Sequence, residues 1–274
     1  LEPADGSSYN TAVGSQAGFA VTTGTENTLL GALAGAALTT SIRSVLLGYQ
    51  AGDALTEGSE NIAVGKSALS ADTLGSRTTA IGKSALSAQN FTTATNSYNV
   101  ALGYEAGKAV TTGTLNTLIG SLAGDALTTG TSNAVLGYAA LSTDDVGNFS
   151  TAIGHGALNA QNYATSTDGY NTAVGAKAGE SITTGVHNTL IGGATGDALT
   201  DADYNVSLGY ATLTADTLGS KSVALGSFTL ANQNFTTATD TFNIAIGYAS
   251  GLSVTTGVSN TLIGGLAGDA LTDA

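Results

Sequence analysis

The pentapeptide Asn10-Thr11-Ala12-Val13-Gly14 is the first of fifteen copies of one motif. The other copies begin at residues 27, 44, 61, 78, 99, 116, 133, 150, 171, 188, 205, 222, 243 and 260, and the fifth position is glycine in every copy. Neighbouring copies are 17 residues apart eleven times and 21 residues apart three times. A fixed period near twenty residues is typical of a solenoid, in which each coil contacts only its neighbours. The sequence therefore predicts an all-β parallel β-solenoid over residues 10–274, preceded by a lead-in over residues 1–9.

Each motif reads as a short strand between two corners. Counting from the asparagine, position 4 is always Val, Leu or Ile, and position 2 lies on the same face of a strand by the period-2 rule. We expect these two positions to point into the core, with position 4 represented by Val13, Leu30, Ile81, Ile119, Ile191 and Ile263. The glycine at position 5 is expected to need positive φ or close backbone approach. The asparagine at position 1 suits the opposite corner, where stacked copies are expected to form a structural amide ladder.

A second pattern relates positions 9 and 12. Nine coils have glycine at position 9 and an aliphatic residue at position 12, whereas six have leucine at position 9 and Asp or Gln at position 12. A core of fixed volume requires one aliphatic side chain from one of the two places, because a missing leucine would cost about 2–5 kcal/mol. This compensation predicts coils that pack in register.

Position 3 bears on the oligomeric state. It is Ala, Leu, Val or once Ser, and it points away from positions 2 and 4. The strand is thus apolar on both faces, which is the pattern of a sheet covered on both sides. Because soluble monomers avoid a continuous apolar stripe, we expect position 3 to contact other subunits around a common axis.

Charge and composition exclude several classes of function. The chain has 20 acidic and 7 basic residues, a net charge of −13, which disfavours nucleic acid and anionic membranes as partners. There is no cysteine, and no apolar run is long enough for a transmembrane helix. Since the chain starts without methionine and stops inside its last coil, we expect a segment of a longer protein.

The strand motif resembles a known repeat. Asn-Thr-Ala-Val-Gly-x-x-Ala, with variants such as residues 61–68 and 222–226, is similar to the head repeats of YadA-like trimeric autotransporter adhesins and to repeats of phage tail fibres. The resemblance covers residues 10–274. It implies a left-handed β-roll, three chains around one axis, and a role in surface attachment outside the cell or on a virion.

The three 21-residue coils carry related inserts that are the candidate binding loops. They span residues 89–98, 161–170 and 233–242, and each holds two aromatic residues seven positions apart among Thr, Ser and Asn. The candidate residues are Phe91, Tyr98, Tyr163, Tyr170, Phe235 and Phe242. Loops on a rigid scaffold often bind, and aromatic rings beside amides and hydroxyls suit a host glycan or protein. The alternative is that the rings fasten the insert to the coil wall or to the next subunit.

Other columns have mainly structural interpretations. Tyrosine follows the corner glycine in five coils, which we assign to packing. Position 13 is threonine in eleven coils, which leaves ice binding open as an alternative function. The acidic clusters lack the nonapeptide of calcium β-rolls, and His155 and His187 stand in different coil types without a catalytic or metal-ligand set.

The sequence therefore predicts a structural and adhesive fibre segment, a homotrimeric rod that displays loops at regular intervals. It predicts no enzyme, no cofactor, no metal site and no membrane insertion of this segment. An ice-binding solenoid and a glycan-processing solenoid enzyme remain the alternatives.

Overall fold

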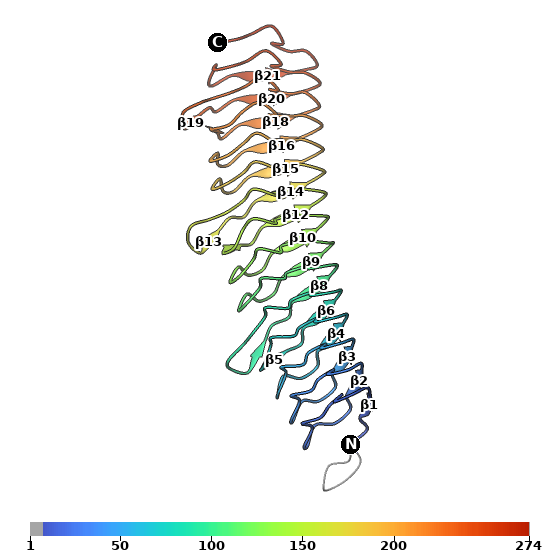
Figure 1. Ribbon diagram of the computed structural model, residues 1–274. Helices are drawn as coiled ribbons and strands as arrows, with labels where there is room; N and C mark the ends of the chain where they lie inside the picture. Colours follow the sequence, from blue (N-terminus) through green and yellow to red (C-terminus); the bar gives the residue numbers. More distant parts are fainter. Residues whose placement is uncertain (1–7, 274) are drawn as a thin grey trace. The chain divides into compact units, whose positions relative to one another are not determined.

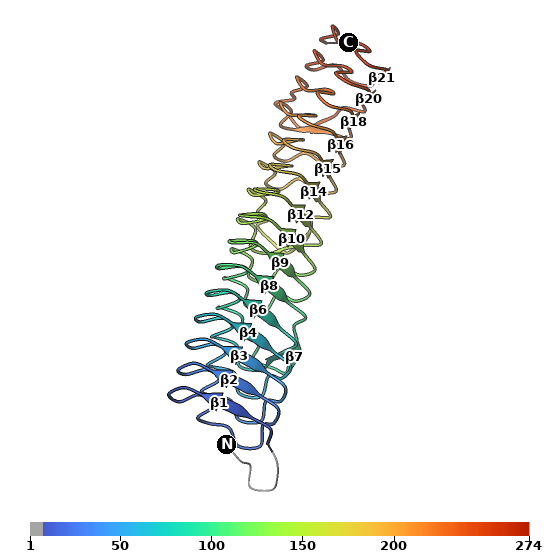
Figure 2. The ribbon, with the colours of Figure 1, turned by 90° about the vertical axis from the view of Figure 1, so that its right-hand side faces the viewer.

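The computed structural model describes residues 8–273 and confirms a parallel β-solenoid of about fifteen turns, with no helix among those residues. Most of the expected lead-in, residues 1–7, lies outside the described part, as does residue 274. The chain forms two compact units, Leu1–Asn133 and Ala134–Ala274. Within each unit, successive coils stack so that their strands form one wall (Figures 1 and 2).

Each long-sheet strand has three residues and occupies positions 2 to 4 of a coil. In the first unit the strands are β1 (Thr11–Val13), β2 (Thr28–Leu30), β3 (Val45–Leu47), β4 (Ile62–Val64), β6 (Thr79–Ile81), β8 (Val100–Leu102) and β9 (Thr117–Ile119). In the second unit they are β10 (Ala134–Leu136), β12 (Thr151–Ile153), β14 (Thr172–Val174), β15 (Thr189–Ile191), β16 (Val206–Leu208), β18 (Val223–Leu225), β20 (Ile244–Ile246) and β21 (Thr261–Ile263).

The register is strict, because each residue pairs with the residue at the same coil position in the next coil. Leu29 lies beside Leu46 across a 17-residue step, and Ala80 lies beside Ala101 across a 21-residue step. The longer coils keep the register because their extra residues lie outside the wall, where a two-residue strand of each long coil pairs with a two-residue strand of the preceding 17-residue coil. These pairs are β5 (Gly75–Ser76) with β7 (Thr95–Asn96), β11 (Gly147–Asn148) with β13 (Thr167–Asp168), and β17 (Gly219–Ser220) with β19 (Thr239–Asp240).

The orientation predicted for the strands is wrong. Position 3 points inward, and Leu29 and Leu46 are fully buried. Positions 2 and 4 point outward: Val13 is 57% exposed, Leu30 51% and Ile263 67%. Of the other three residues predicted in the core, Ile191 is exposed, and Ile81 and Ile119 are half-buried.

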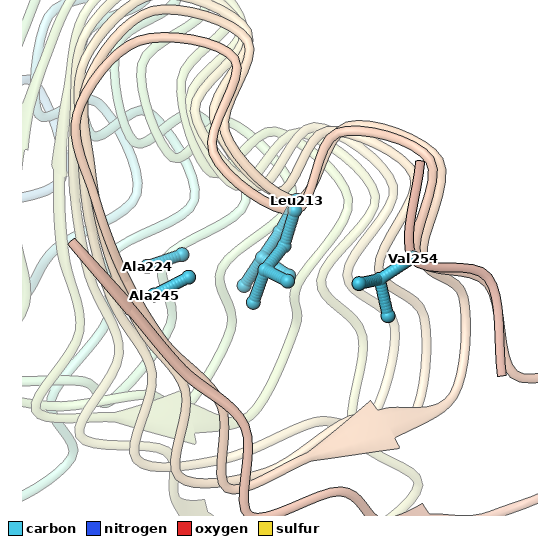
Figure 3. Packing of buried hydrophobic residues seen from close by; sticks show 5 residues of the cluster. Leu213, Ala224, Ala245 and Val254 are labelled. Carbon is cyan, nitrogen blue, oxygen red and sulfur yellow. The ribbon is translucent and has the colours of Figure 1, made fainter. Parts of the chain in front are cut away.

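The physical reason is the width of the interior. At the strand it admits one side chain per coil, and that side chain meets the aliphatic residue supplied by position 9 or 12. Figure 3 shows this packing in the second unit, where Leu213 from position 9 and Val254 from position 12 lie near Ala224 and Ala245 from position 3. The two outward positions of the strand carry mainly Thr at position 2 and Val, Leu or Ile at position 4.

The compensation between positions 9 and 12 is confirmed. A Cβ atom on Gly35 would lie 2.6 Å from Cδ1 of Leu38 and 2.9 Å from Cδ1 of Leu46, so position 9 cannot carry a side chain in that coil. Where position 9 is leucine, as in Leu69 and Leu86, its side chain is fully buried and fills the same space. One aliphatic side chain is therefore supplied from either position.

Both corners behave as the sequence predicts. Gly31 has φ +132°, and a Cβ on it would lie 2.6 Å from the carbonyl oxygen of Gly48 in the next coil. At the opposite corner, buried Asn27 donates from Nδ2 to the carbonyl of Ser41 at 2.8 Å and accepts from the amide of Ser44 at 2.9 Å. The asparagine column is thus a structural ladder that links each coil to the next.

Candidate functional site

The surface formed by positions 2 and 4 exposes aliphatic side chains in each unit, and we name it the outer sheet face. Its exposed aliphatic residues are Val13, Leu30, Ile62 and Leu102 in the first unit, and Leu136, Ile191, Val206, Leu208, Ile244, Ile246 and Ile263 in the second. Threonine at position 2 alternates with these residues. Since monomeric proteins rarely expose a contiguous apolar patch above a few hundred Å², such a face indicates an interaction surface.

One edge of the outer sheet face is formed by the residue before each position 1, which we name the leading edge column. Its residues have φ between +47° and +62°. In the first unit this column is a ladder of charges. Arg43 Nε lies 3.1 Å from Glu26, Arg77 Nε lies 3.0 Å from Glu60, and Arg77 also donates to the Tyr98 hydroxyl at 2.8 Å.

In the second unit the leading edge column is a stack of aromatic rings. Phe149, Tyr170, His187 and Tyr204 lie face to face, with centroids 5.2, 5.2 and 4.8 Å apart and interplanar angles of 15° or less. All four side chains are exposed. Offset stacked rings contribute about 0.5–1.5 kcal/mol per pair beyond the area they bury, so the column stabilises the coil stack while staying open to solvent.

The other edge is formed by position 6, directly after the corner glycine, and we name it the trailing edge column. In the first unit Lys66 lies over the ring of Tyr49 at 5.9 Å and Lys83 lies over the ring of Tyr104 at 5.0 Å. In the second unit Tyr138 stacks on His155 with centroids 5.5 Å apart. The tyrosines after the corner glycine therefore pack on neighbouring coils, and they are also exposed.

The six candidate insert residues divide into two groups. Phe91, Tyr163 and Phe235 are buried and fasten each insert to the coil wall, as the structural alternative predicted. Tyr98, Tyr170 and Phe242 are exposed, but they belong to the leading edge column because each directly precedes a position 1. The exposed tips of the inserts are short segments of Thr, Ala and Ser: residues 92–94, 164–166 and 236–238.

Beneath each insert lies a buried polar network. The Asp72 carboxylate accepts from the amides of Gly75 at 3.0 Å and Phe91 at 3.1 Å, and from Gln89 Nε2 at 2.6 Å. Gln89 in turn accepts from Asn99. Asp144 with Gln161 and Asp216 with Gln233 repeat this arrangement in the second unit. Burial raises the pKa of these three carboxyls above its ordinary value, and the hydrogen bonds from glutamine and backbone amides only partly offset this shift.

Tyr163 adds to the middle network. Its hydroxyl donates to the carbonyl of Gly185 at 3.0 Å and accepts from Asn171 Nδ2 at 3.1 Å. Burial raises the pKa of Tyr163 well above its ordinary value. These contacts anchor the middle insert to the coil that follows it.

The position-13 threonines, on which the ice-binding alternative rests, are engaged within the fold. Thr22 Oγ1 donates to the carbonyl of Thr39 at 3.1 Å, and Thr39 Oγ1 donates to the carbonyl of Thr56 at 3.2 Å. Thr111, Thr183, Thr200 and Thr255 repeat the contact with the coil that follows each of them. This column therefore uses its hydroxyl protons to join coils.

Charge is distributed unevenly around the coil. Six of the seven basic residues lie in the edge columns or one residue beyond them: Arg43, Lys66, Arg77, Lys83, Lys177 and Lys221. Four acidic residues occupy the same positions: Glu26, Glu60, Glu105 and Asp203. The borders of the outer sheet face thus carry six positive and four negative charges, a balance of +2 in a chain of net charge −13.

Residues 8–273 contain no pocket and no group of three or more His, Cys, Asp or Glu side chains placed to hold a metal ion. No helix in that part of the chain could span a membrane. Comparison with protein-family models, with curated proteins and with solved structures finds no match to this chain. The candidate sites are therefore surfaces: the outer sheet face, its two edge columns and the insert tips.

Sequence reasoning missed the edge columns as continuous features. The signal was present, because the residue before each position 1 recurs at the same 17- and 21-residue spacing as the motif. Tyr98, Tyr170 and Phe242 were instead grouped with the inserts that they terminate.

Proposed function

We propose that this chain is a structural and adhesive fibre segment whose copies associate as a homotrimer through their outer sheet faces. The observation that carries the proposal is the exposure of aliphatic side chains along one wall of each unit, exemplified by Leu30 and Leu102. Burying apolar surface contributes roughly 25 cal/mol per Å², so a wall of such residues favours association strongly.

A fibre role also fits the way the coils are joined. Backbone hydrogen bonds, the asparagine ladder and the position-13 threonine ladder all run from one coil to the next within each unit. Such continuous bonding resists bending and extension, as a mechanical element requires. The insert tips are the parts that would meet a host glycan or protein outside the cell or at a virion surface, because they stand at regular sequence intervals on this scaffold.

The first experiment is the solution mass by light scattering. We expect a value near three times 26.7 kDa for the purified chain. A variant with Leu30→Lys, Ile62→Lys and Leu102→Lys places three charges on the outer sheet face and should be monomeric. The matched control Thr23→Lys, Thr40→Lys and Thr112→Lys places three charges at exposed positions away from this face and should stay trimeric. A wild-type chain that is monomeric at all concentrations would refute the trimer.

The adhesive part has its own test. Replacing the exposed tips at 92–94, 164–166 and 236–238 by Gly-Ser-Gly keeps the buried anchors Phe91, Tyr163 and Phe235 in place. Adhesion to host cells or to a glycan array is expected to fall at least tenfold while the mass is unchanged. If the variant adheres as well as the wild-type chain, the insert tips are not the binding site and this segment acts as a spacer.

A further inference from the structure

The two edge columns have a defined place in such an assembly, and the following inference rests on the proposed trimer. Three flat sheets that face a common axis meet at three corners. At each corner the leading edge of one sheet adjoins the trailing edge of the next, because a three-fold ring is built from heterologous contacts. Residues at equal height along the axis are brought together, so each coil faces the same coil of its neighbour.

We propose that the leading edge column of one subunit packs in register against the trailing edge column of the next, with Glu60 of one copy facing Lys66 of the adjacent copy. Glu60 lies two residues before β4 and Lys66 lies two residues after it, so the two border the same strand. Both side chains are exposed.

The register places one pair of opposite charges, Glu60 and Lys66, at a corner of the first unit. Neither Lys66 nor Lys83 forms an ion pair within the described residues, and each lies instead over a tyrosine ring of the neighbouring coil. Glu60 already accepts from Arg77 at 3.0 Å and lies 3.8 Å from Arg43, so Lys66 of the adjacent copy would share this carboxylate with two arginines of the chain that carries it. Its remaining exposure permits one further cation.

One coil places like charges at the corner, because Arg77 precedes the strand that Lys83 follows. Arg77 is held along its own column by Glu60, at 3.0 Å, and by the Tyr98 hydroxyl, 2.8 Å away. Lys83 is within the field of Glu105, which lies in the next coil of its own chain. Each of these two cations is therefore close to an acidic side chain of its own subunit.

In the second unit the same rule brings aromatic edges together. Tyr204 precedes β16 and Tyr210 follows its corner glycine, and Phe242 and Tyr248 border β20 in the same way. All four rings are exposed in the single chain. Contact at the corner would cover them, which accounts for aromatic residues beside an already apolar face.

The absence of cysteine from the chain makes site-directed cross-linking unambiguous. The test variant carries Glu60→Cys and Lys66→Cys and is treated with a short bis-maleimide. The matched off-register control carries Glu26→Cys and Lys83→Cys, whose coils are three steps apart, about 14 Å along the stack. Each single variant serves as a background control, and circular dichroism and the mass before labelling establish that folding and assembly persist.

We expect the test variant to give covalent trimers on a denaturing gel and the off-register variant to give at least tenfold less. Cross-linking in the off-register variant alone, or a trimeric mass without cross-linking of the test variant, would overturn the pairing but leave the trimer standing. A monomeric mass before labelling would instead remove the trimer itself, and the pairing with it.

Discussion

Adjacent leucines in β2 give a direct test of which strand face is interior. Leu29 is fully buried and Leu30 is 51% exposed, although both are leucine in the same three-residue strand. The proposed substitutions are Leu29→Ala and Leu30→Ala, which remove the same atoms from opposite faces. Each variant therefore serves as the control for the other.

The expected magnitudes follow from burial. Leu29→Ala removes a leucine from a closed core and should lower the free energy of unfolding by about 2–5 kcal/mol. Leu30→Ala removes about three carbons that are roughly half in contact with solvent, so the expected loss in an isolated chain is about 1 kcal/mol. The two costs should differ by at least 1 kcal/mol.

The measurement is equilibrium unfolding in urea at several protein concentrations. If copies associate through the outer sheet face, the cost of Leu30→Ala should rise with concentration, because the lost contacts include those between subunits. The cost of Leu29→Ala should be the same at every concentration. A larger cost for Leu30→Ala at the lowest concentration would refute the inward assignment of position 3.

Three further predictions concern the corners, the buried carboxyls and the inserts. Gly192→Ala should lower the melting temperature markedly, because Gly192 has φ +139° and the new Cβ would overlap the carbonyl of Gly209. The control Gly193→Ala should leave the melting temperature unchanged, because no atom lies closer than 3.5 Å to its new Cβ. Asp72, Asp144 and Asp216 have raised pKa values in the folded chain, so they bind protons more tightly there than in the unfolded chain. The free energy of unfolding should therefore rise as pH falls from 7 toward about 4. Replacing all three by asparagine should flatten this pH dependence in thermal melts. Tyr163→Phe should lower the free energy of unfolding by only about 1–3 kcal/mol, because phenylalanine occupies the equivalent place in the other two inserts. Faster amide hydrogen exchange confined to residues near 163 and 185 would show that this loss of stability is local.

Much of the fold could be predicted because the strand motif occurs fifteen times at a regular spacing. The period placed every long-sheet strand, and the invariant glycine and the asparagine column identified the two corners. These features depend on local backbone geometry, which a single residue type can reveal. The 21-residue coils also kept the register as expected, because their inserts leave the wall without shifting the strand.

The candidate sites were harder to predict because they depend on which way a side chain points. An insert with two aromatic residues gives no local signal that Phe91 turns in and Tyr98 turns out. The difference arises from the network of Asp72 and Gln89, whose carboxylate accepts from the Phe91 amide and fixes that ring against the wall. Contacts between coils decide the outcome, and the spacing within one insert does not express them.

The inward face of the strand was misassigned for a related reason, yet the sequence contains evidence that identifies it. Both faces of the strand are apolar, so the alternation of hydrophobic residues cannot identify the buried face. The larger residues at position 4 suggested that this position points into the core. The compensation of side-chain volume between positions identifies the buried face. Leucine occurs at position 3 only in coils with glycine at position 9, whereas the six coils with leucine at position 9 have Ala, Val or Ser at position 3.

Position 4 shows no such exchange, because Val, Leu and Ile occur there in both coil types. When the side-chain volume at one position decreases as that at another increases, the two side chains must occupy the same space in the core. Position 3 varies with position 9 in this way, whereas position 4 does not. The contact expected of a Cβ on Gly35 with Leu29, at 3.1 Å, shows the shared space directly. In a solenoid with two apolar strand faces, covariation of side-chain volume between positions is therefore a better guide to the core than hydrophobicity.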